Sequence, residues 1–138
     1  MEYSILLVDD EEAFHILIPN FLALVKKHTF TVHSAINGEE GVEMYSKLAK
    51  DGQKPNLVLM DLRMPVMDGV EATKRLIEKD PKANCYLFTA YTGTEAERDV
   101  LKAGAKGTVN KGTDWNRTVE EIVNTLESVQ EKIIIDTD

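Results

Sequence analysis

The sequence predicts an α/β fold: a doubly wound sheet of five parallel strands with five helices on its two faces. Five short apolar segments alternate with five longer amphipathic segments along the chain. The apolar segments are mostly continuous runs, which is typical of strands covered on both faces. Regular alternation of strands and helices favours a parallel sheet joined by right-handed crossovers. The 138 residues are enough for one domain with a substantial core.

Each predicted strand is short, and polar or small residues follow it. We expect strands at residues 5–8, 30–35, 57–60, 86–89 and 107–110. The first of these runs ends in four consecutive acids, Asp9, Asp10, Glu11 and Glu12. Acids in the first turn of a helix interact favourably with its positive end, so we interpret Glu11 and Glu12 as the start of the first helix. Asp9 and Asp10 repel each other unless a positive group lies nearby, which makes them candidates for a cation site.

The segments between the strands have helical periodicity. We expect helices at residues 11–28, 38–50, 70–79, 95–103 and 114–132. Gly52 and Gly104 follow the second and fourth helices, and Pro81 follows the third, as residues that end helices commonly do. The first helix is apolar almost all round and contains Pro19, which we expect to kink it. The last helix is the clearest, because its apolar residues form one stripe: Trp115, Val119, Ile122, Val123, Leu126 and Val129.

The composition excludes several classes of function. The chain has 24 acids against 16 bases, a net charge of −8, and no basic patch suited to direct nucleic acid binding or to an anionic membrane surface. No apolar run approaches the ~18–20 residues of a membrane span, and the order of a signal peptide is missing. Cys85 is the only cysteine and lies in an apolar run, so we interpret it as a core residue. A reduced, cytoplasmic setting is expected.

Side chains that can bind ligands or take part in a reaction stand at the ends of four of the five predicted strands. Asp9 and Asp10 follow the first, Asp61 the third, Thr89 closes the fourth, and Lys111 follows the fifth. In open parallel sheets, ligands bind beyond the carboxyl ends of the strands. We therefore expect three carboxylates, a hydroxyl and an ammonium group to converge at one edge of the sheet.

These residues resemble the receiver domain of two-component response regulators. The resemblance rests on the acid pair, on the segment "MDLRMPVMDG" that contains Asp61, on Thr89-Ala90 and on Lys111, all in the order and spacing of that family. It covers roughly residues 2–130 and implies the strand order 2-1-3-4-5. It also implies a receiver domain at residues 1–132 and a C-terminal tail, or the start of a linker, at residues 133–138.

The resemblance implies a Mg²⁺ site. In the family pattern Asp10 and Asp61 bind the ion directly, the main-chain carbonyl of Arg63 adds a ligand, and Asp9 acts through water. This assignment agrees with the preference of Mg²⁺ for octahedral oxygen ligands. The same pattern makes Asp61 the nucleophile that takes a phosphoryl group from a phosphohistidine, forming an acyl phosphate.

Two further residues would act on the phosphoryl group. Lys111 would pair with the phosphoryl oxygens, and Thr89 would donate its hydroxyl to them. The protein would then be a phosphoacceptor signalling domain rather than an enzyme, with only limited self-phosphorylation and autodephosphorylation. It would signal by conformational change or by phosphorelay.

Two positions depart from the family pattern. Family members usually follow the lysine with a proline in a cis peptide bond, whereas this chain has Gly112. A cis bond without proline costs ~2.5–4 kcal/mol, so we expect a trans bond and a different course of this loop. An aromatic residue usually stands three positions before the lysine, and this chain has Thr108 there. The usual coupling to the hydroxyl of Thr89 is therefore absent, and we expect Tyr91 or another surface to carry the signal.

Arg63 and Tyr91 occupy positions that vary in the family and tune dephosphorylation. Both residues are bulky in this chain. We expect them to shield the acyl phosphate from water, which would give a long-lived phosphorylated state.

Other classes of function fit less well. Phosphohydrolases with an aspartate nucleophile carry a second Asp two residues later, where this chain has Arg63. A nucleotide-binding or flavin-binding module needs a phosphate loop after the first strand, and the four acids from Asp9 onward would repel a phosphate. The remaining alternative is a receiver-fold interaction module that signals without phosphorylation.

The expected partners are a sensor histidine kinase or a phosphotransfer protein, together with an output protein or domain. The first helix is either a docking face for a kinase helix or is covered by neighbouring loops. A homodimer through the last two helices and a continuation of the chain beyond Asp138 both remain open.

Overall fold

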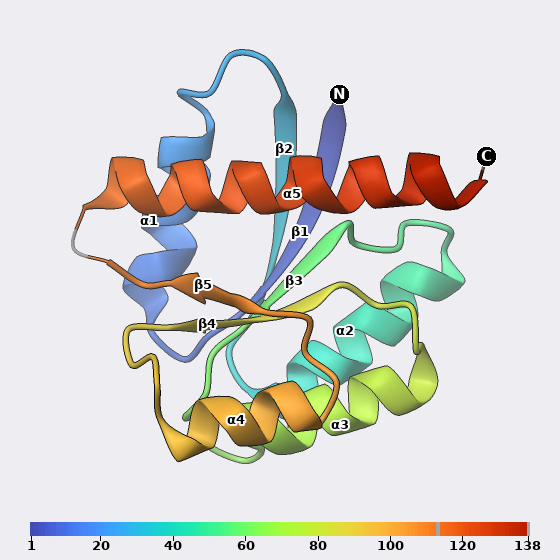
Figure 1. Cartoon of the computed structure of the whole chain (residues 1–138). Coiled ribbons are helices and arrows are strands. Elements are labelled where there is room, and N and C mark those ends of the chain that lie inside the picture. Colours follow the sequence, from blue (N-terminus) through green and yellow to red (C-terminus); the bar gives the residue numbers. More distant parts are fainter. Residues whose placement is uncertain (113, 138) are drawn as a thin grey trace.

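The computed structural model describes residues 1–112 and 114–137 and contains one five-stranded parallel sheet (Figure 1). The strand order is β2-β1-β3-β4-β5, which confirms the predicted fold class and order. The strands are β1 (Glu2–Val8), β2 (Thr29–Ala35), β3 (Leu57–Met60), β4 (Cys85–Thr89) and β5 (Thr108–Asn110).

The first strand begins earlier than predicted. We expected it to start at residue 5, but β1 begins at Glu2 because Glu2 pairs with Thr29 and Tyr3 with Phe30 of β2. Only Tyr3 is buried among the first three residues, so the apolar run that marks the rest of the strand does not extend to its start. Pairing with the neighbouring strand therefore fixes this end.

The helices are α1 (Glu12–Leu22), α2 (Gly38–Lys50), α3 (Gly69–Lys79), α4 (Glu95–Lys102) and α5 (Trp115–Thr137). All five begin within one residue of their predicted starts. The prediction that the first helix continues to residue 28 is wrong, because α1 ends at Leu22. Beyond that point the backbone N–H groups of Leu24 and Val25 bond carbonyls three residues back, which is the geometry of tight turns.

The turn after α1 places His28 against α5. Its Nε2 lies 2.8 Å from Glu127 Oε2, so this segment is held by tertiary contacts instead of helical bonds. Pro19 lies inside α1, and the helix continues for three residues beyond it. Glu11 occupies the N-cap position and Glu12 the first turn, as predicted for these two acids.

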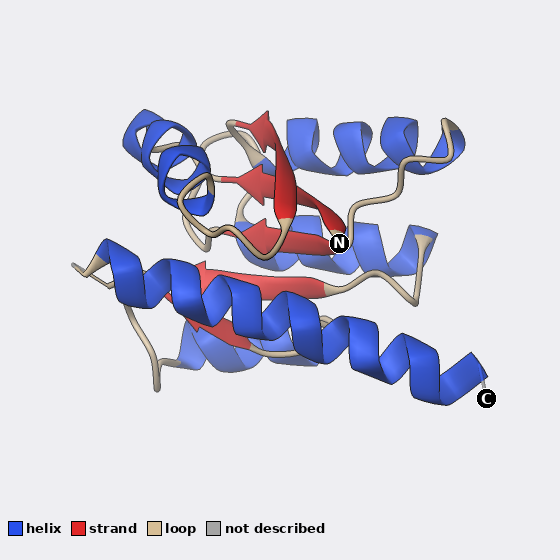
Figure 2. Cartoon of the chain, turned by 90° about the horizontal axis from the view of Figure 1, so that it is seen from above, coloured by secondary structure: helices blue, strands red, loops and turns tan. Residues whose placement is uncertain are grey.

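α5 is the longest helix and continues past the strands in Figure 2. Its predicted apolar stripe is buried from Val119 to Val129, and Trp115 is half-buried. The helix crosses residue 132, where we place the end of the domain, and residue 138 of the expected tail lies outside the described residues. The boundary itself stays a prediction. Among the described residues, no helix combines the length and apolar character needed to cross a membrane.

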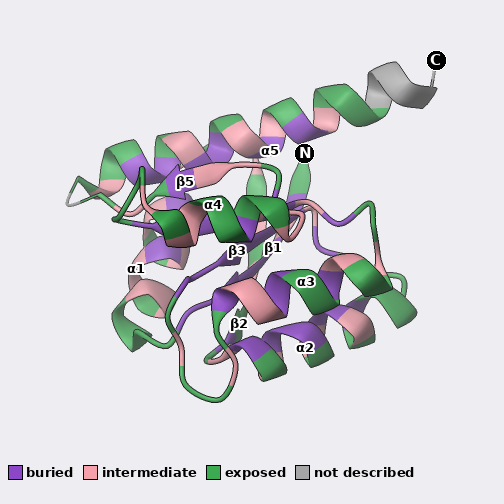
Figure 3. Cartoon of the chain, turned by 60° about the horizontal axis from the view of Figure 1, so that its bottom comes forward, coloured by how far each residue is buried: buried purple, intermediate pink, exposed green. Residues whose placement is uncertain are grey.

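The sheet has helices on both faces (Figure 3). α1 and α5 pack together on one face, over Ile5, Leu7 and Phe88, whereas α2, α3 and α4 lie on the other. Cys85 is buried beneath that second group of helices, as predicted for a core residue, and burial raises the pKa of its thiol to about 11. The two layers leave the carboxyl ends of the strands at one edge, where the candidate site lies.

Candidate functional site

Asp9, at the end of β1, has every main-chain group fixed. Its N–H donates to the carbonyl of Ala35 at 3.0 Å, and its carbonyl accepts a hydrogen bond from His15 Nε2 at 2.7 Å. Its Oδ1 accepts from the N–H of Glu11 at 2.9 Å, and the residue is completely buried. Because a carbonyl only accepts, the proton of this bond belongs to Nε2 of His15.

Asp61, at the end of β3, lies beside Asp9. Its N–H donates to the carbonyl of Val8 at 2.9 Å, and its Oδ1 accepts from the N–H of Leu62 at 2.9 Å. A Cβ atom at position 69 would lie 2.1 Å from the main-chain oxygen of Asp61, so only glycine fits there. Gly69 thus allows the start of α3 to close tightly over the loop that carries Asp61.

Lys111 completes the cluster from the end of β5. Its N–H donates to the carbonyl of Thr89 at 2.9 Å, which anchors the backbone to β4. Its Nζ lies 2.7 Å from Asp9 Oδ2 and 3.1 Å from Asp61 Oδ1, and 8% of its side chain is exposed. The described residues contain no cis peptide bond, so the predicted trans bond at Gly112 is confirmed. The N–H of Gly112, which a proline would lack, donates to Thr118 Oγ1 at 3.3 Å.

Two aromatic rings cover the ammonium group of Lys111. Its Nζ lies 4.4 Å from the ring centroid of Phe14 and 5.3 Å from that of Phe88. The Phe14 ring also meets Trp115 edge-on, with 5.2 Å between centroids. The ammonium group of Lys111 therefore contacts two carboxylates and two aromatic rings.

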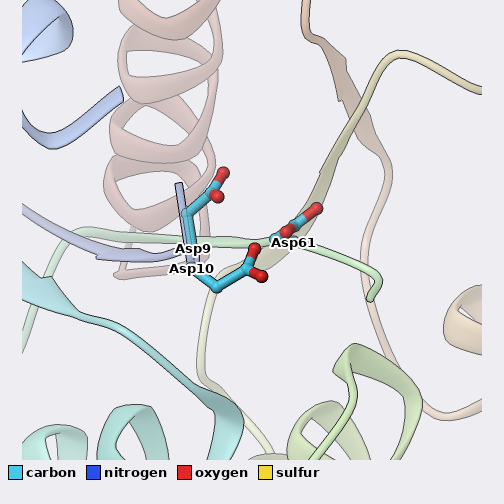
Figure 4. Close-up of side chains that lie close together, drawn as sticks. All are labelled: Asp9, Asp10 and Asp61. Carbon is cyan, nitrogen blue, oxygen red and sulfur yellow. The ribbon is translucent and has the colours of Figure 1, made fainter. Parts of the chain in front are cut away.

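The three predicted acids could hold a metal ion together. Carboxylate oxygens of Asp9, Asp10 and Asp61 lie within 4.8 Å of one another (Figure 4). Asp9 Oδ2 is buried and, although ion-paired with Lys111, has no aligned hydrogen bond within the described residues. A buried carboxylate oxygen without such a donor is stabilised by a cation, and carboxylate oxygens are the ligands that Mg²⁺ prefers. The residues present therefore fit a Mg²⁺ site.

The electrostatics of the cluster also favour an added positive charge. Burial, and secondarily the charge of Asp9, raise the pKa of Asp61 to about 6, although Lys111 opposes the rise. Burial lowers the pKa of Lys111, but the carboxylates of Asp9 and Asp61 outweigh it and hold that pKa above its ordinary value. One ammonium group thus faces more carboxylate charge than it can neutralise.

Thr89 ends β4 with a buried side chain. Its Oγ1 accepts a hydrogen bond from the N–H of Tyr91 at 3.1 Å, so its own hydroxyl proton can be donated elsewhere. A cleft of about 580 Å³ brings Thr89 together with Asp10, Asp61 and Lys111. The other residues on this cleft include Glu11, Phe14, Arg63, Tyr91 and Trp115. All the site residues predicted from sequence, apart from the buried Asp9 behind them, thus border one cleft.

Thr108 stands where the family usually has an aromatic residue, and its partner is a carboxylate. Its Oγ1 donates to Glu97 Oε2 at 2.8 Å. The other oxygen of Glu97 accepts from the N–H of Gly93 at 2.8 Å, in the loop that follows Thr89 and Tyr91. A hydrogen-bonded carboxylate therefore links β5 to this loop.

Sequence reasoning missed two neighbours of the site, Phe14 and His15. Neither is among the candidates predicted from sequence: the three histidines show no metal-binding spacing, and Phe14 is one of the many apolar residues of the first helix. The structure places both on the part of α1 that faces the cluster. Both stand within three residues of Glu12, in the first turn of α1, and this closeness to the acids is the only signal the sequence contains.

The parallel sheet and the acidic cleft at its edge define a class of signalling domain, and the comparisons with known proteins agree. Residues 5–123 match the response regulator receiver domain family, so the chain belongs to this family of two-component signalling proteins. Receiver domains are signalling domains, generally not enzymes, that interact with kinases and other proteins and bind Mg²⁺ in an acidic pocket.

The chain is similar to chemotaxis proteins. It is 37% identical to the chemotaxis protein CheY of Halobacterium salinarum over 112 residues, which cover 80% of this chain and 86% of that protein. It is 34% identical to the chemotaxis protein CheY of Bacillus subtilis over 126 residues, which cover 91% and 99% respectively. A solved CheY-like receiver domain from Methanospirillum hungatei superposes with a TM-score of 0.74 at 26% identity, covering 96% of this chain and 99% of that one.

Proposed function

We propose that this receiver domain takes a phosphoryl group from a phosphohistidine onto Asp61 in a Mg²⁺-dependent reaction. The donor is a sensor histidine kinase or a phosphotransfer protein, and the product signals by conformational change or passes the phosphoryl group on in a relay. The observation that carries the proposal is the packing of Lys111 against Asp61 and Asp9, at 3.1 and 2.7 Å. We place the reaction in the cytoplasm.

The transfer is an in-line displacement at phosphorus. Oδ1 of Asp61 accepts hydrogen bonds from Leu62 N–H and from Lys111, whereas Oδ2 accepts none from the described residues and is the oxygen proposed to attack. A P–O bond forms, the P–N bond to the imidazole breaks, and the imidazole keeps the electron pair of that bond. Such a transfer depends on positioning and charge stabilisation more than on proton transfer.

The residues of this chain stabilise the transferred group from two sides. Lys111 moves its ammonium group from the Asp61 carboxylate to a phosphoryl oxygen, and Thr89 donates its hydroxyl proton to another. Mg²⁺ would be held by Asp10, Asp61 and the main-chain carbonyl of Arg63, with Asp9 acting through water. When bound, the ion neutralises charge on the phosphoryl oxygens.

The signal would leave the site through the loop after β4. When the hydroxyl of Thr89 turns to the phosphoryl group, its bond with the N–H of Tyr91 is disturbed. Tyr91, of which 72% is exposed, is the first residue to respond, and the Gly93–Glu97–Thr108 bonds extend the change to β5. Amide shifts of the phosphorylated and free protein test this route: no change around Tyr91 and Thr108, with clear change elsewhere, would exclude it.

The partner surfaces belong to the same proposal. Ile18 and Leu22 of α1 are buried, but Ile16 remains 56% exposed and gives the helix one apolar contact for a kinase helix. An output protein or domain is a second proposed partner. A homodimer through the last two helices is an outcome that sedimentation of the phosphorylated protein would reveal.

Intact mass spectrometry after incubation with acetyl phosphate and Mg²⁺ tests the proposal. We expect one phosphoryl adduct, absent from Asp61→Asn and retained in the matched control Asp99→Asn on α4. An absence of any adduct on the unaltered protein would instead support the alternative, an interaction module that signals without phosphorylation.

A further inference from the structure

We propose that Phe14 of α1 is a positioning residue for Lys111, holding the ammonium group against its ring face. This inference rests on the proposed function, because it assigns the device that keeps the site lysine ready to meet a phosphoryl group. It concerns a residue of the first helix that is not among the site residues predicted from sequence.

The contact geometry supports the assignment. Nζ of Lys111 lies 4.4 Å from the ring centroid of Phe14, well within the range of about 6 Å for attraction between a cation and an aromatic ring. An ammonium group has three donors, and the carboxylates of Asp9 and Asp61 contact it. The rings of Phe14 and Phe88 approach the same group, with centroids 4.4 and 5.3 Å from Nζ. Because only 8% of the Lys111 side chain is exposed, little water competes with these contacts.

The chain segment after Lys111 makes such a device useful. The next residue is Gly112, whose backbone is the least restricted of any residue type. The backbone of Lys111 is anchored at its N–H, to Thr89, but its long side chain has many rotamers. The rings of Phe14 and Phe88 restrict those rotamers at the ammonium end of the side chain, which is the end that takes part in the reaction.

Contact with an aromatic ring also allows the ammonium group of Lys111 to move. A hydrogen bond to a carboxylate is directional, whereas attraction to a ring face changes little when the cation slides over it. Lys111 can therefore turn from Asp61 Oδ1 to a phosphoryl oxygen while it keeps the favourable contact with Phe14.

The ring itself is held in place by its neighbours. Phe14 meets Phe88 of β4 edge-on, with 5.6 Å between centroids, and Trp115 of α5 at 5.2 Å. Edge-to-face pairs of this kind are favourable beyond the area they bury. The packing of α1 against α5 thus sets the position of the Phe14 ring.

Two substitutions and a matched control test the inference. Phe14→Leu keeps an apolar side chain but removes the ring, and Phe14→Tyr keeps the ring. Phe21→Leu is the control, because Phe21 also packs on Trp115 from α1, at 6.3 Å, without a ring contact to Lys111 among the described residues. Circular dichroism and thermal unfolding establish that each variant is folded before the reaction is measured.

The first readout is the maximal rate of phosphorylation by acetyl phosphate at saturating Mg²⁺. For Phe14→Leu we expect a fall on the order of tenfold, with a nearly unchanged Mg²⁺ concentration for half-saturation. Phe14→Tyr restores the rate to within about twofold, and Phe21→Leu leaves it unchanged. A Phe14→Leu rate equal to that of the unaltered protein, or a Phe21→Leu rate lowered as much, would overturn the inference.

A second readout does not depend on phosphorylation. The ring current of Phe14 should shift the Lys111 ε-methylene protons upfield in NMR spectra, because Nζ lies over the ring. Phe14→Leu should move them downfield, whereas Phe21→Leu should not. An unmoved signal would contradict the contact itself. If the unaltered protein is never phosphorylated but the signal moves as expected, the proposed function fails and the contact stands.

Discussion

Thr108 donates a hydrogen bond of 2.8 Å to Glu97, so that β5 and the first turn of α4 are joined through a carboxylate. The same carboxylate accepts from the N–H of Gly93 at 2.8 Å, ahead of the N-cap residue Thr94. Two hydrogen bonds to one ionised group thus tie the loop after Thr89 to the neighbouring strand.

Replacing Thr108 by valine should weaken this tie. The change keeps the side-chain shape but removes the donor, and we expect a loss of about 0.5–1.5 kcal/mol in the free energy of unfolding. Urea unfolding at pH 7 measures it. An equally stable variant would show that the bond contributes nothing in solution.

The same variant should also change the pH dependence of stability. The Gly93 N–H, and then the Thr108 hydroxyl, lower the pKa of Glu97 below its ordinary value of 4.5. The stabilisation is therefore complete above pH 4.5 and is lost as the pH falls through the lower pKa of the folded state. Unfolding measured between pH 6 and about 3 should show a smaller acid loss in Thr108→Val than in the unaltered protein.

Asp61→Asn should stabilise the protein in metal-free buffer. The pKa of Asp61 is raised from 3.8 to about 6, so the ionised form destabilises the fold above pH 6 and this penalty disappears below pH 3.8. Asp61→Asn also takes a carboxylate partner from Lys111, which offsets part of the gain. We therefore expect an increase of about 1–2 kcal/mol in the free energy of unfolding at pH 7.5, measured by urea unfolding with a chelator. A less stable Asp61→Asn protein at that pH would contradict the raised pKa. The difference should vanish near pH 3.5.

Mg²⁺ should raise the unfolding temperature, because the carboxylates of Asp9, Asp10 and Asp61 come together only in the folded protein. Saturation at 100 times the dissociation constant adds about 2.7 kcal/mol to the free energy of unfolding. Asp10→Asn should lose most of this gain. Glu12→Gln should keep it, because Glu12 lies in the first turn of α1 and is not a predicted ligand. Equal loss in both variants would mean that the ion responds to general negative charge and not to the predicted ligands.

Arg63→Ala and Tyr91→Ala should each shorten the lifetime of the phosphorylated protein. Both side chains border the cleft and are proposed to limit the access of water to the acyl phosphate. The loss of adduct over time after removal of excess acetyl phosphate measures the lifetime. A markedly longer lifetime after either substitution would contradict this role.

The sequence revealed those parts of the site that depend on strand ends. Asp9, Asp61 and Lys111 each follow an apolar run, and parallel strands bring such positions to one edge whatever the helices do. Phe14 could not be placed in this way, because its direction depends on how α1 rotates against α5. The end of α1 was missed for a related reason: the apolar residues from Leu22 onward continue in turns that tertiary contacts hold.

The hydrogen bond made by the loop after Lys111 could not be predicted either, again for a physical reason. Family resemblance showed that Gly112 breaks the usual pattern, but not where the freed backbone N–H would go. The structure shows its acceptor, Thr118 Oγ1, on the helix that follows. Which residue of a helix lies opposite a loop is set by packing and is not encoded in local sequence periodicity.

The central claim is that Asp61 is the phosphoacceptor, and the most direct test is to locate the modified residue. Borohydride reduces an acyl phosphate on aspartate to homoserine, which peptide mass spectrometry identifies by position. After treatment with acetyl phosphate and Mg²⁺ we predict homoserine at position 61 and unmodified aspartate at positions 9 and 10. Homoserine at another position, or none at any position in a protein shown to bind Mg²⁺, would contradict the account.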